Sequence, residues 1–198
     1  HNFGDSCITL LEYIVKFVTA LHFMYPEGIV AYKVALRSDA DRLVYPMRHL
    51  QWSIGVPFLV LLSNRAFLAG RFSQVQVVLR SLPVCLLTTM YCVTAYVMEV
   101  TTSIAARNLL IGLTMISFIW ATVDQLQLVQ CIDGVTAKRL KVAMLGYQIL
   151  TFAAYSVVYF VAYFGYIGHQ SEQSIYNYMD ATVKVLHGCF LAMIRNYE

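Results

Sequence analysis

Six long apolar segments, separated by short polar stretches, constrain the fold of this 198-residue chain more than any other feature. They run over about Ile8–Val30, Leu43–Leu62, Val75–Val97, Ile104–Val129, Val142–Ile167 and Ile175–Ile194. Crossing a bilayer takes about 20 apolar residues of helix. Only 13% of the residues are charged, against about 25% in soluble domains. No connecting stretch has room for a soluble domain, so we expect an all-α membrane protein, with residues 1–198 forming a single transmembrane helix bundle.

Charge and cysteine content exclude several classes of function. The net charge of +3 is small, and the basic residues lie at segment ends rather than on one face, so no nucleic-acid partner is expected. The five cysteines show no CxxC pair or other metal-ligand spacing, and most lie in apolar segments, where a thiol behaves as a small apolar group. We therefore expect no metal site, and membrane lipid as the surroundings.

Basic residues are divided unevenly between the two sets of connecting stretches. One set holds Arg65, Arg71, Lys138, Arg139, Lys141 and Arg195, whereas the other holds Lys33, Arg37, Arg42 and Arg107 diluted by acids. Short cytoplasmic loops carry the excess of lysine and arginine. We therefore expect a multi-pass membrane protein with its C-terminus in the cytoplasm.

A lone amine, Lys184, interrupts the last apolar segment four residues after Asp180. A charge near the middle of a membrane helix costs several kcal/mol, so it must face the protein interior and have a partner. Residues four apart share one face of a helix, so Asp180 points where Lys184 points. Two interpretations follow: a structural ion pair, or a lysine that forms a Schiff base with a carbonyl ligand and has Asp180 as its counter-ion.

The second apolar segment carries its own polar stripe. Arg48, Gln51, Trp52 and Gly55 recur at spacings of three and four and so line one face of a helix. An intramembrane arginine needs an acidic partner or water, and Asp180 is the expected candidate. Trp52 offers a flat apolar wall for a conjugated ligand.

Together these motifs resemble the microbial (type I) rhodopsins. The resemblance rests on Arg48-x-x-Gln51-Trp52-x-x-x-x-Pro57 followed, near the C-terminus, by Asp180-x-x-x-Lys184. It implies a seven-helix fold of the rhodopsin type, with retinal bound to Lys184 as a covalent Schiff base and Asp180 as a counter-ion. It also implies that Arg48, Gln51 and Trp52 line the retinal site.

The fifth segment extends the resemblance. Its Phe152-x-x-Tyr155-Ser156-x-x-Tyr159 is similar to the family's Trp-x-x-Tyr-Pro-x-x-Trp, with serine in place of the usual proline. By that match, Phe152, Tyr155 and Tyr159 flank the polyene of retinal. The resemblance covers nearly the whole chain.

Two departures from the family matter. The six segments align with the family's second to seventh helices, and the chain begins at His1 without a signal peptide, so we interpret it as an excerpt whose first helix is missing. The second departure is Gln51, which occupies the place of the proton-accepting carboxylate. A glutamine amide cannot accept that proton at physiological pH, so proton pumping of the usual kind is not expected.

Three histidines and a polar stripe each allow a simple structural interpretation. In the first segment the polar stripe consists of Glu12, Lys16, Thr19, His22 and Phe23. Glu12 and Lys16 are interpreted as an i,i+4 pair, with the wall of an aqueous pathway as the alternative. His22 lies deeper, either as a hydrogen-bonded core histidine or along that pathway. His49 is displaced by about 100° from Arg48 around the helix, so we expect it to face a neighbouring helix. His187 follows Lys184 by one turn, where a proton relay is the less favoured interpretation.

The leading hypothesis is a retinal-binding, light-sensing membrane protein that acts as a light-gated ion channel and is not an enzyme. With Gln51 neutral while Arg48 and the Lys184 nitrogen are cationic, the path should favour anions among inorganic ions. We expect a homo-oligomer. The alternative is a regulatory photoreceptor domain fused to an effector: a cyclase, a phosphodiesterase or a bestrophin-like channel. A third interpretation is a retinal-free transporter.

Overall fold

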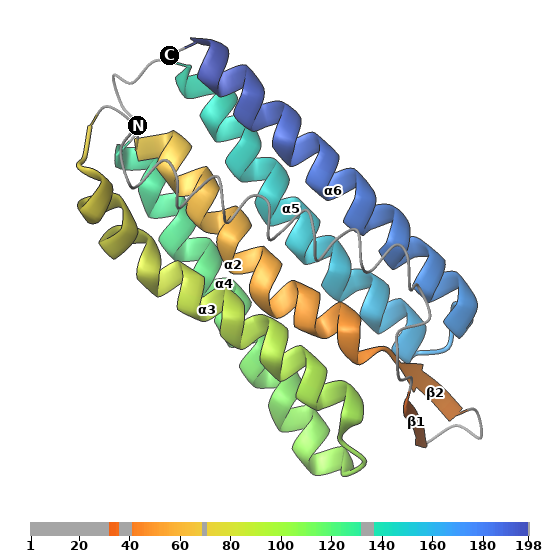
Figure 1. The fold of residues 1–198 in the computed structure, drawn as a ribbon. Coiled ribbons are helices and arrows are strands. Elements are labelled where there is room, and N and C mark those ends of the chain that lie inside the picture. The colour runs from red at the N-terminus through yellow and green to blue at the C-terminus, as the bar shows by residue number, and fades with distance from the viewer. Residues whose placement is uncertain (1–31, 36–40, 69–70, 132–136, 198) are drawn as a thin grey trace. The chain divides into compact units, whose positions relative to one another are not determined.

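The computed structural model describes residues 32–35, 41–68, 71–131 and 137–197 (Figure 1). Within them lie five long helices and one pair of strands. In chain order these are β1 (Tyr32–Ala35), β2 (Asp41–Val44), α2 (Pro46–Leu68), α3 (Gln74–Val100), α4 (Ile104–Cys131), α5 (Lys138–Tyr163) and α6 (His169–Tyr197). The segment Ile8–Val30, predicted to be the first span, lies outside the described residues, and so do Glu12, Lys16 and His22. The remaining five predicted spans each correspond to one helix.

The beginning and end of the second span differ from the prediction. Leu43 lies in β2, and α2 starts only at Pro46, where proline's fixed φ suits a first helical turn. At the other end α2 continues to Leu68, so Ser63 and Asn64, predicted to belong to a polar break, are helical and fully buried. The Nδ2 atom of Asn64 donates to Ser81 Oγ of α3 at 3.2 Å. This contact with the next helix accounts for a polar amide inside the bundle.

Strands β1 and β2 form an antiparallel pair that the sequence did not predict. Tyr32 pairs with Val44 and Ala35 with Asp41. This stretch was interpreted as a connecting loop rich in charge. Because each strand has only four residues and its charges interrupt the alternation of apolar and polar positions, the sequence carries little strand signal there.

The chain divides into two compact units, residues 1–65 with 72–126 and residues 66–71 with 127–198. In the first, Asn64 meets Ser81, and Thr114 Oγ1 of α4 donates to Thr94 Oγ1 of α3 at 2.9 Å. In the second, α5 and α6 pack against each other and are joined by a turn in which Gly165 has a φ of +80°. Glycine adopts such a left-handed conformation without steric cost. Ser73 begins α3 with a reciprocal capping box to Gln76.

Surface and interior are inverted relative to a water-soluble bundle. Large apolar side chains such as Leu79, Trp120 and Leu150 are exposed, whereas Asn64, Lys141 and Glu172 are buried. Three stretches among the described residues are long and apolar enough to cross a membrane: Gln74–Val100, Ile104–Leu128 and Lys138–Tyr163. This distribution suits helices whose outer faces meet lipid and whose polar groups turn inward.

Candidate functional site

The inward face of α6 is a row of polar side chains. Its buried residues include Glu172, Tyr176, Asp180 and His187. They follow one another at intervals of four, four and seven residues, which places them on one helix face. The outward face instead carries apolar side chains such as Val185 and Met193.

Lys184 occupies the same face, one turn after Asp180. Asp180 is 2% exposed, and the Nζ atom of Lys184 is buried from solvent. The predicted proximity of an amine and a carboxylate on the inner face of the last helix is therefore present. Burial of both groups agrees with the expectation that a membrane lysine must turn inward.

A tyrosine of α5 fixes the carboxylate. The hydroxyl of Tyr155 donates to Asp180 Oδ1 at 2.5 Å, a length typical of a strong bond to a charged oxygen. The ring of Tyr155 also stacks on Tyr176, with centroids 5.8 Å apart and planes inclined by 14°. Tyr176 lies one turn before Asp180 on α6, so its ring supports the tyrosine that bonds the carboxylate.

The three aromatic residues predicted on α5 share one side of that helix. Phe152, Tyr155 and Tyr159 are spaced by three and four residues. Tyr159 is buried and stacks on Tyr163 with centroids 6.0 Å apart. Of the three, the structure brings Tyr155 into direct contact with the Asp180 carboxylate.

Two contacts give the register of α5 against α6. Tyr155 meets Asp180, and the ring of Tyr147 lies 5.7 Å from that of Phe190, so the helices run antiparallel. Counting along both helices from these contacts places Thr151 and Phe152 level with Lys184. At the height of Lys184, α5 therefore carries an aromatic and a hydroxyl-bearing residue, and Asp180 lies one turn away on α6.

These residues fit a covalently attached conjugated ligand. A buried primary amine supplies the atom to which a carbonyl group can be joined, and the adjacent carboxylate can balance a positive charge there. Aromatic side chains at the same level provide an apolar wall. Among the described residues, no cluster of three or more metal-ligating side chains occurs.

The other predicted site residues lie on α2, in the first unit. Arg48 and Gln51 are both 3% exposed, and Trp52 is half-buried. The Arg48 guanidinium lies 5.7 Å from the centroid of the Tyr45 ring. The expected partner of Arg48, Asp180, belongs to the second unit, so that pairing stays a prediction.

Gln51 has both amide atoms buried, and neither has a hydrogen-bond partner among the described residues. An uncharged amide thus occupies the α2 position where the resemblance places a carboxylate. Leaving such atoms without partners is costly in a protein interior.

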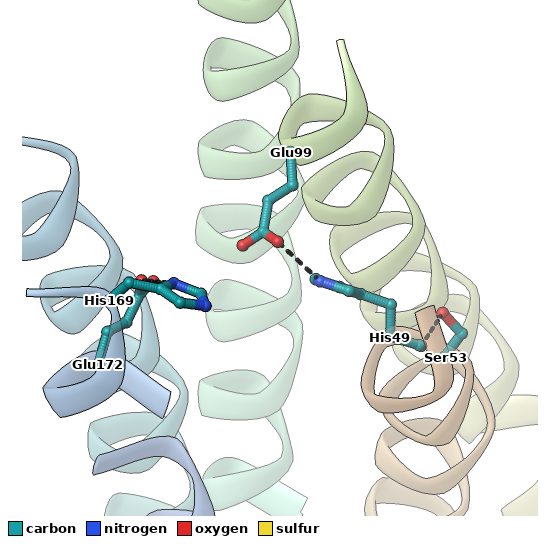
Figure 2. A network of polar contacts seen from close by, with 5 residues as sticks. All are labelled: His49, Ser53, Glu99, His169 and Glu172. Carbon is teal, nitrogen blue, oxygen red and sulfur yellow. Dashed lines mark hydrogen bonds and ion pairs between the residues drawn. The ribbon is translucent and has the colours of Figure 1, made fainter. Parts of the chain in front are cut away.

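The sequence predicted that His49 faces a neighbouring helix, and this is confirmed. Its Nε2 atom lies 3.0 Å from Glu99 Oε2 of α3, as Figure 2 shows. Figure 2 also shows Ser53, whose Oγ donates to the His49 carbonyl at 2.8 Å. Glu99 was predicted to belong to a polar break but lies in the last turn of α3. The helical spacing of His49 signalled a neighbour, although nothing in the sequence identified which residue it meets.

The fold and the lysine site define a multi-pass helical membrane protein. A family model described as bacteriorhodopsin-like protein matches residues 4–196. The chain belongs to this family and is a type I microbial rhodopsin. Members of the family bind retinal through a lysine, so retinal is the cofactor that membership implies. No curated protein sequence matches the chain at a significant level.

Solved structures share the fold at low sequence identity. The thermophilic rhodopsin from Rubrobacter xylanophilus is similar with a TM-score of 0.81 and 18% identity, over 98% of this chain and 84% of that one. The light-driven proton pump rhodopsin of Coccomyxa subellipsoidea is similar with a TM-score of 0.80 and 16% identity, over 98% of this chain and 84% of that one. A light-driven proton pump from Leptosphaeria maculans is similar with a TM-score of 0.77 and 16% identity, over 99% of this chain and 85% of that one. Such matches concern the fold, and pumping is a property of those two proteins.

Proposed function

We propose that this rhodopsin binds retinal covalently at Lys184 and acts as a light-gated, anion-favouring ion channel rather than a proton pump. When bound, retinal supplies absorption of visible light and a change of shape on isomerisation. Lys184 anchors it, and Asp180 balances the proton held on the Lys184 nitrogen. Tyr155 keeps that carboxylate in place through its 2.5 Å hydrogen bond.

The observation that carries the argument against pumping is Gln51. A pump needs a group on the extracellular side of the lysine nitrogen that accepts its proton and later releases it. Gln51 is buried and its amide neither gains nor loses a proton at physiological pH. The proton pumps among the similar structures share only 16% of their residues with this chain, so they do not decide its activity.

The preference for anions follows from charge. Arg48 is permanently cationic and buried, and Gln51 beside it carries no negative charge. A cationic lining with a neutral amide favours anions at a constriction. Inorganic anions such as chloride are the proposed conducted species, with a homo-oligomer as the assembly and the C-terminus in the cytoplasm.

Voltage-clamp recording under illumination tests this function. Cells expressing the protein with added all-trans retinal should show a photocurrent whose reversal potential follows the chloride equilibrium potential when chloride is replaced by a large anion. Gln51→Glu should reduce that chloride dependence, whereas Gln127→Glu, on the exposed part of α4, serves as a matched control and should not. A steady outward proton current at zero voltage contradicts the proposal.

The same recording distinguishes the channel from the alternative function, a regulatory light-sensing domain fused to an effector. A sensory domain forms the visible absorption band but carries no photocurrent. No observation among the described residues favours this alternative over the channel.

A further inference from the structure

Three residues of α2 and α3 form a clamp around His49, defined here as Trp52, Tyr96 and Glu99. The imidazole meets Trp52 edge-on, with ring centroids 5.4 Å apart and planes inclined by 75°. The centroid of the Tyr96 ring lies 5.1 Å from that of the His49 imidazole, and Glu99 Oε2 lies 3.0 Å from His49 Nε2. The hydrogen bond at Nε2 adds a directional contact to the two ring contacts. The imidazole is thereby fixed in both position and rotation.

This clamp is a poor device for stability alone. The side chains of His49 and Glu99 are only 6% and 10% exposed, so both lose most of their hydration. Buried pairs of this kind are often no more stable than apolar residues of the same size, whereas they do fix geometry. The fixed imidazole in turn positions Trp52, because the two rings meet in a T-shaped contact.

We propose that Glu99 and His49 are positioning residues for Trp52 and thereby set the wavelength that the protein absorbs. The inference rests on the proposed function, since Trp52 is the expected wall of the retinal site on α2. Losing the edge contact with His49 removes one constraint on the side-chain torsions of Trp52. Its aromatic face would then lie differently against a conjugated ligand, whose absorption responds to the polarisable groups around it.

The retinal-free protein tests the positioning by itself. The chain has two tryptophans, and Trp120 is 64% exposed on α4, so Trp120→Phe leaves Trp52 as the only indole. In this background Glu99→Ala should shift the emission maximum of Trp52 and lower its anisotropy. Glu99→Gln keeps an acceptor oxygen for His49 and should restore values near those of the parent. His49→Gln keeps a donor for Glu99 but removes the ring, so it should resemble Glu99→Ala.

A matched control is a second hydrogen bond between α2 and α3. Ser81 accepts from Asn64 at 3.2 Å, and Ser81→Ala removes this contact without altering the clamp. Trp52 emission should be unchanged in Ser81→Ala. An equal change in this variant would show that any loosening of the two helices moves the indole, and would overturn the proposal.

Adding all-trans retinal to the same variants tests the wavelength. The absorption maximum should shift in Glu99→Ala and His49→Gln, and stay near the parent value in Glu99→Gln and Ser81→Ala. Unchanged Trp52 emission in Glu99→Ala overturns the proposal outright. Changed emission with an unchanged absorption maximum overturns the tuning role and removes Trp52 from the retinal site, while leaving the attachment at Lys184 intact. If the parent forms no visible band, the proposed function fails and the tuning role with it, whereas the emission still decides the positioning.

Discussion

Helices α3, α4 and α5 each contain a stretch apolar enough to cross a membrane by length and composition, whereas α2 and α6 do not. The sequences of α2 and α6 are the more polar ones, although α4 and α5 also bury charged residues, Arg107 and Lys141. α6 buries Glu172 and Asp180 on the face that also carries Lys184, and α2 buries Arg48 and Gln51. Each such group lowers the hydropathy of its helix and costs free energy in a membrane.

This difference in polarity indicates which helices carry the candidate site. A charged side chain in the middle of a membrane helix is costly, so it is usually retained where it holds a ligand or lines an ion path. α5 is an instructive intermediate: it is apolar enough to span, yet its Tyr155 hydroxyl bonds Asp180. A tyrosine contributes one polar atom on a largely apolar ring, so it serves the site without making the helix polar.

The largest effect should come from Lys184. Lys184→Ala removes the amine to which retinal is attached, so no visible band should form when retinal is added. The matched control is Lys141→Met, since Lys141 is also a buried lysine but lies on α5. Absorption spectra of the two purified variants decide the point. A normal band in Lys184→Ala would break the link between α6 and the cofactor.

The next largest effect concerns Asp180. Two opposite charges about 4 Å apart at an effective dielectric of about 20 attract by about 4 kcal/mol, so losing the anion should remove most of what stabilises a positive charge on the Lys184 nitrogen. Asp180→Asn should therefore lose the visible band to a near-ultraviolet one at neutral pH and recover it on acidification or with added halide. A pH titration of the spectrum measures this. A full visible band at neutral pH without halide would assign the counter-ion to another acid.

Substitution of Gln51 tests whether α2 contributes to the retinal site. Gln51→Asp should place an anion one turn from Arg48 and, by the family resemblance, within reach of the Lys184 nitrogen. A positive charge at that nitrogen is then better stabilised in the ground state, so absorption should move to shorter wavelength. An unchanged spectrum would mean that the buried amide of Gln51 does not face the chromophore, and the comparison would then rest on α6 alone.

Tyr155→Phe should have the smallest effect. It removes the hydroxyl that donates to Asp180 and leaves the ring that stacks on Tyr176. Without the donor, more negative charge stays on the carboxylate oxygens, and absorption should move slightly to shorter wavelength. Tyr163→Phe, elsewhere on the same helix, is the control and should leave the spectrum unchanged. A shift as large as that of Gln51→Asp would show that Tyr155 contacts the chromophore directly.

The sequence predicted the elements whose signals are local. Long apolar runs gave the five described helices, and the four-residue spacing of Asp180 and Lys184 gave their shared inward face. Helical phase also predicted that His49 turns toward another helix. In each case the periodicity of a helix carries the information within a few turns of chain.

What the sequence did not predict depends on contacts between distant segments. The sequence predicts Glu99 in a polar break, and only the packing of α2 on α3 shows that it bonds His49. The same holds for Asn64, which looks like a loop residue until Ser81 is beside it. The bond from Tyr155 to Asp180 joins two helices, and the sequence offered only a family resemblance for that tyrosine.

The most direct test of the account is to locate the retinal on the chain. Retinal is added to the full chain, borohydride reduces the imine carbon–nitrogen double bond to a stable amine, and the digested peptides are analysed by mass spectrometry. The account predicts a retinyl mass on the peptide that contains Lys184 and on no other lysine. A retinyl mass on Lys138 or Lys141, or on none of the lysines, would contradict it.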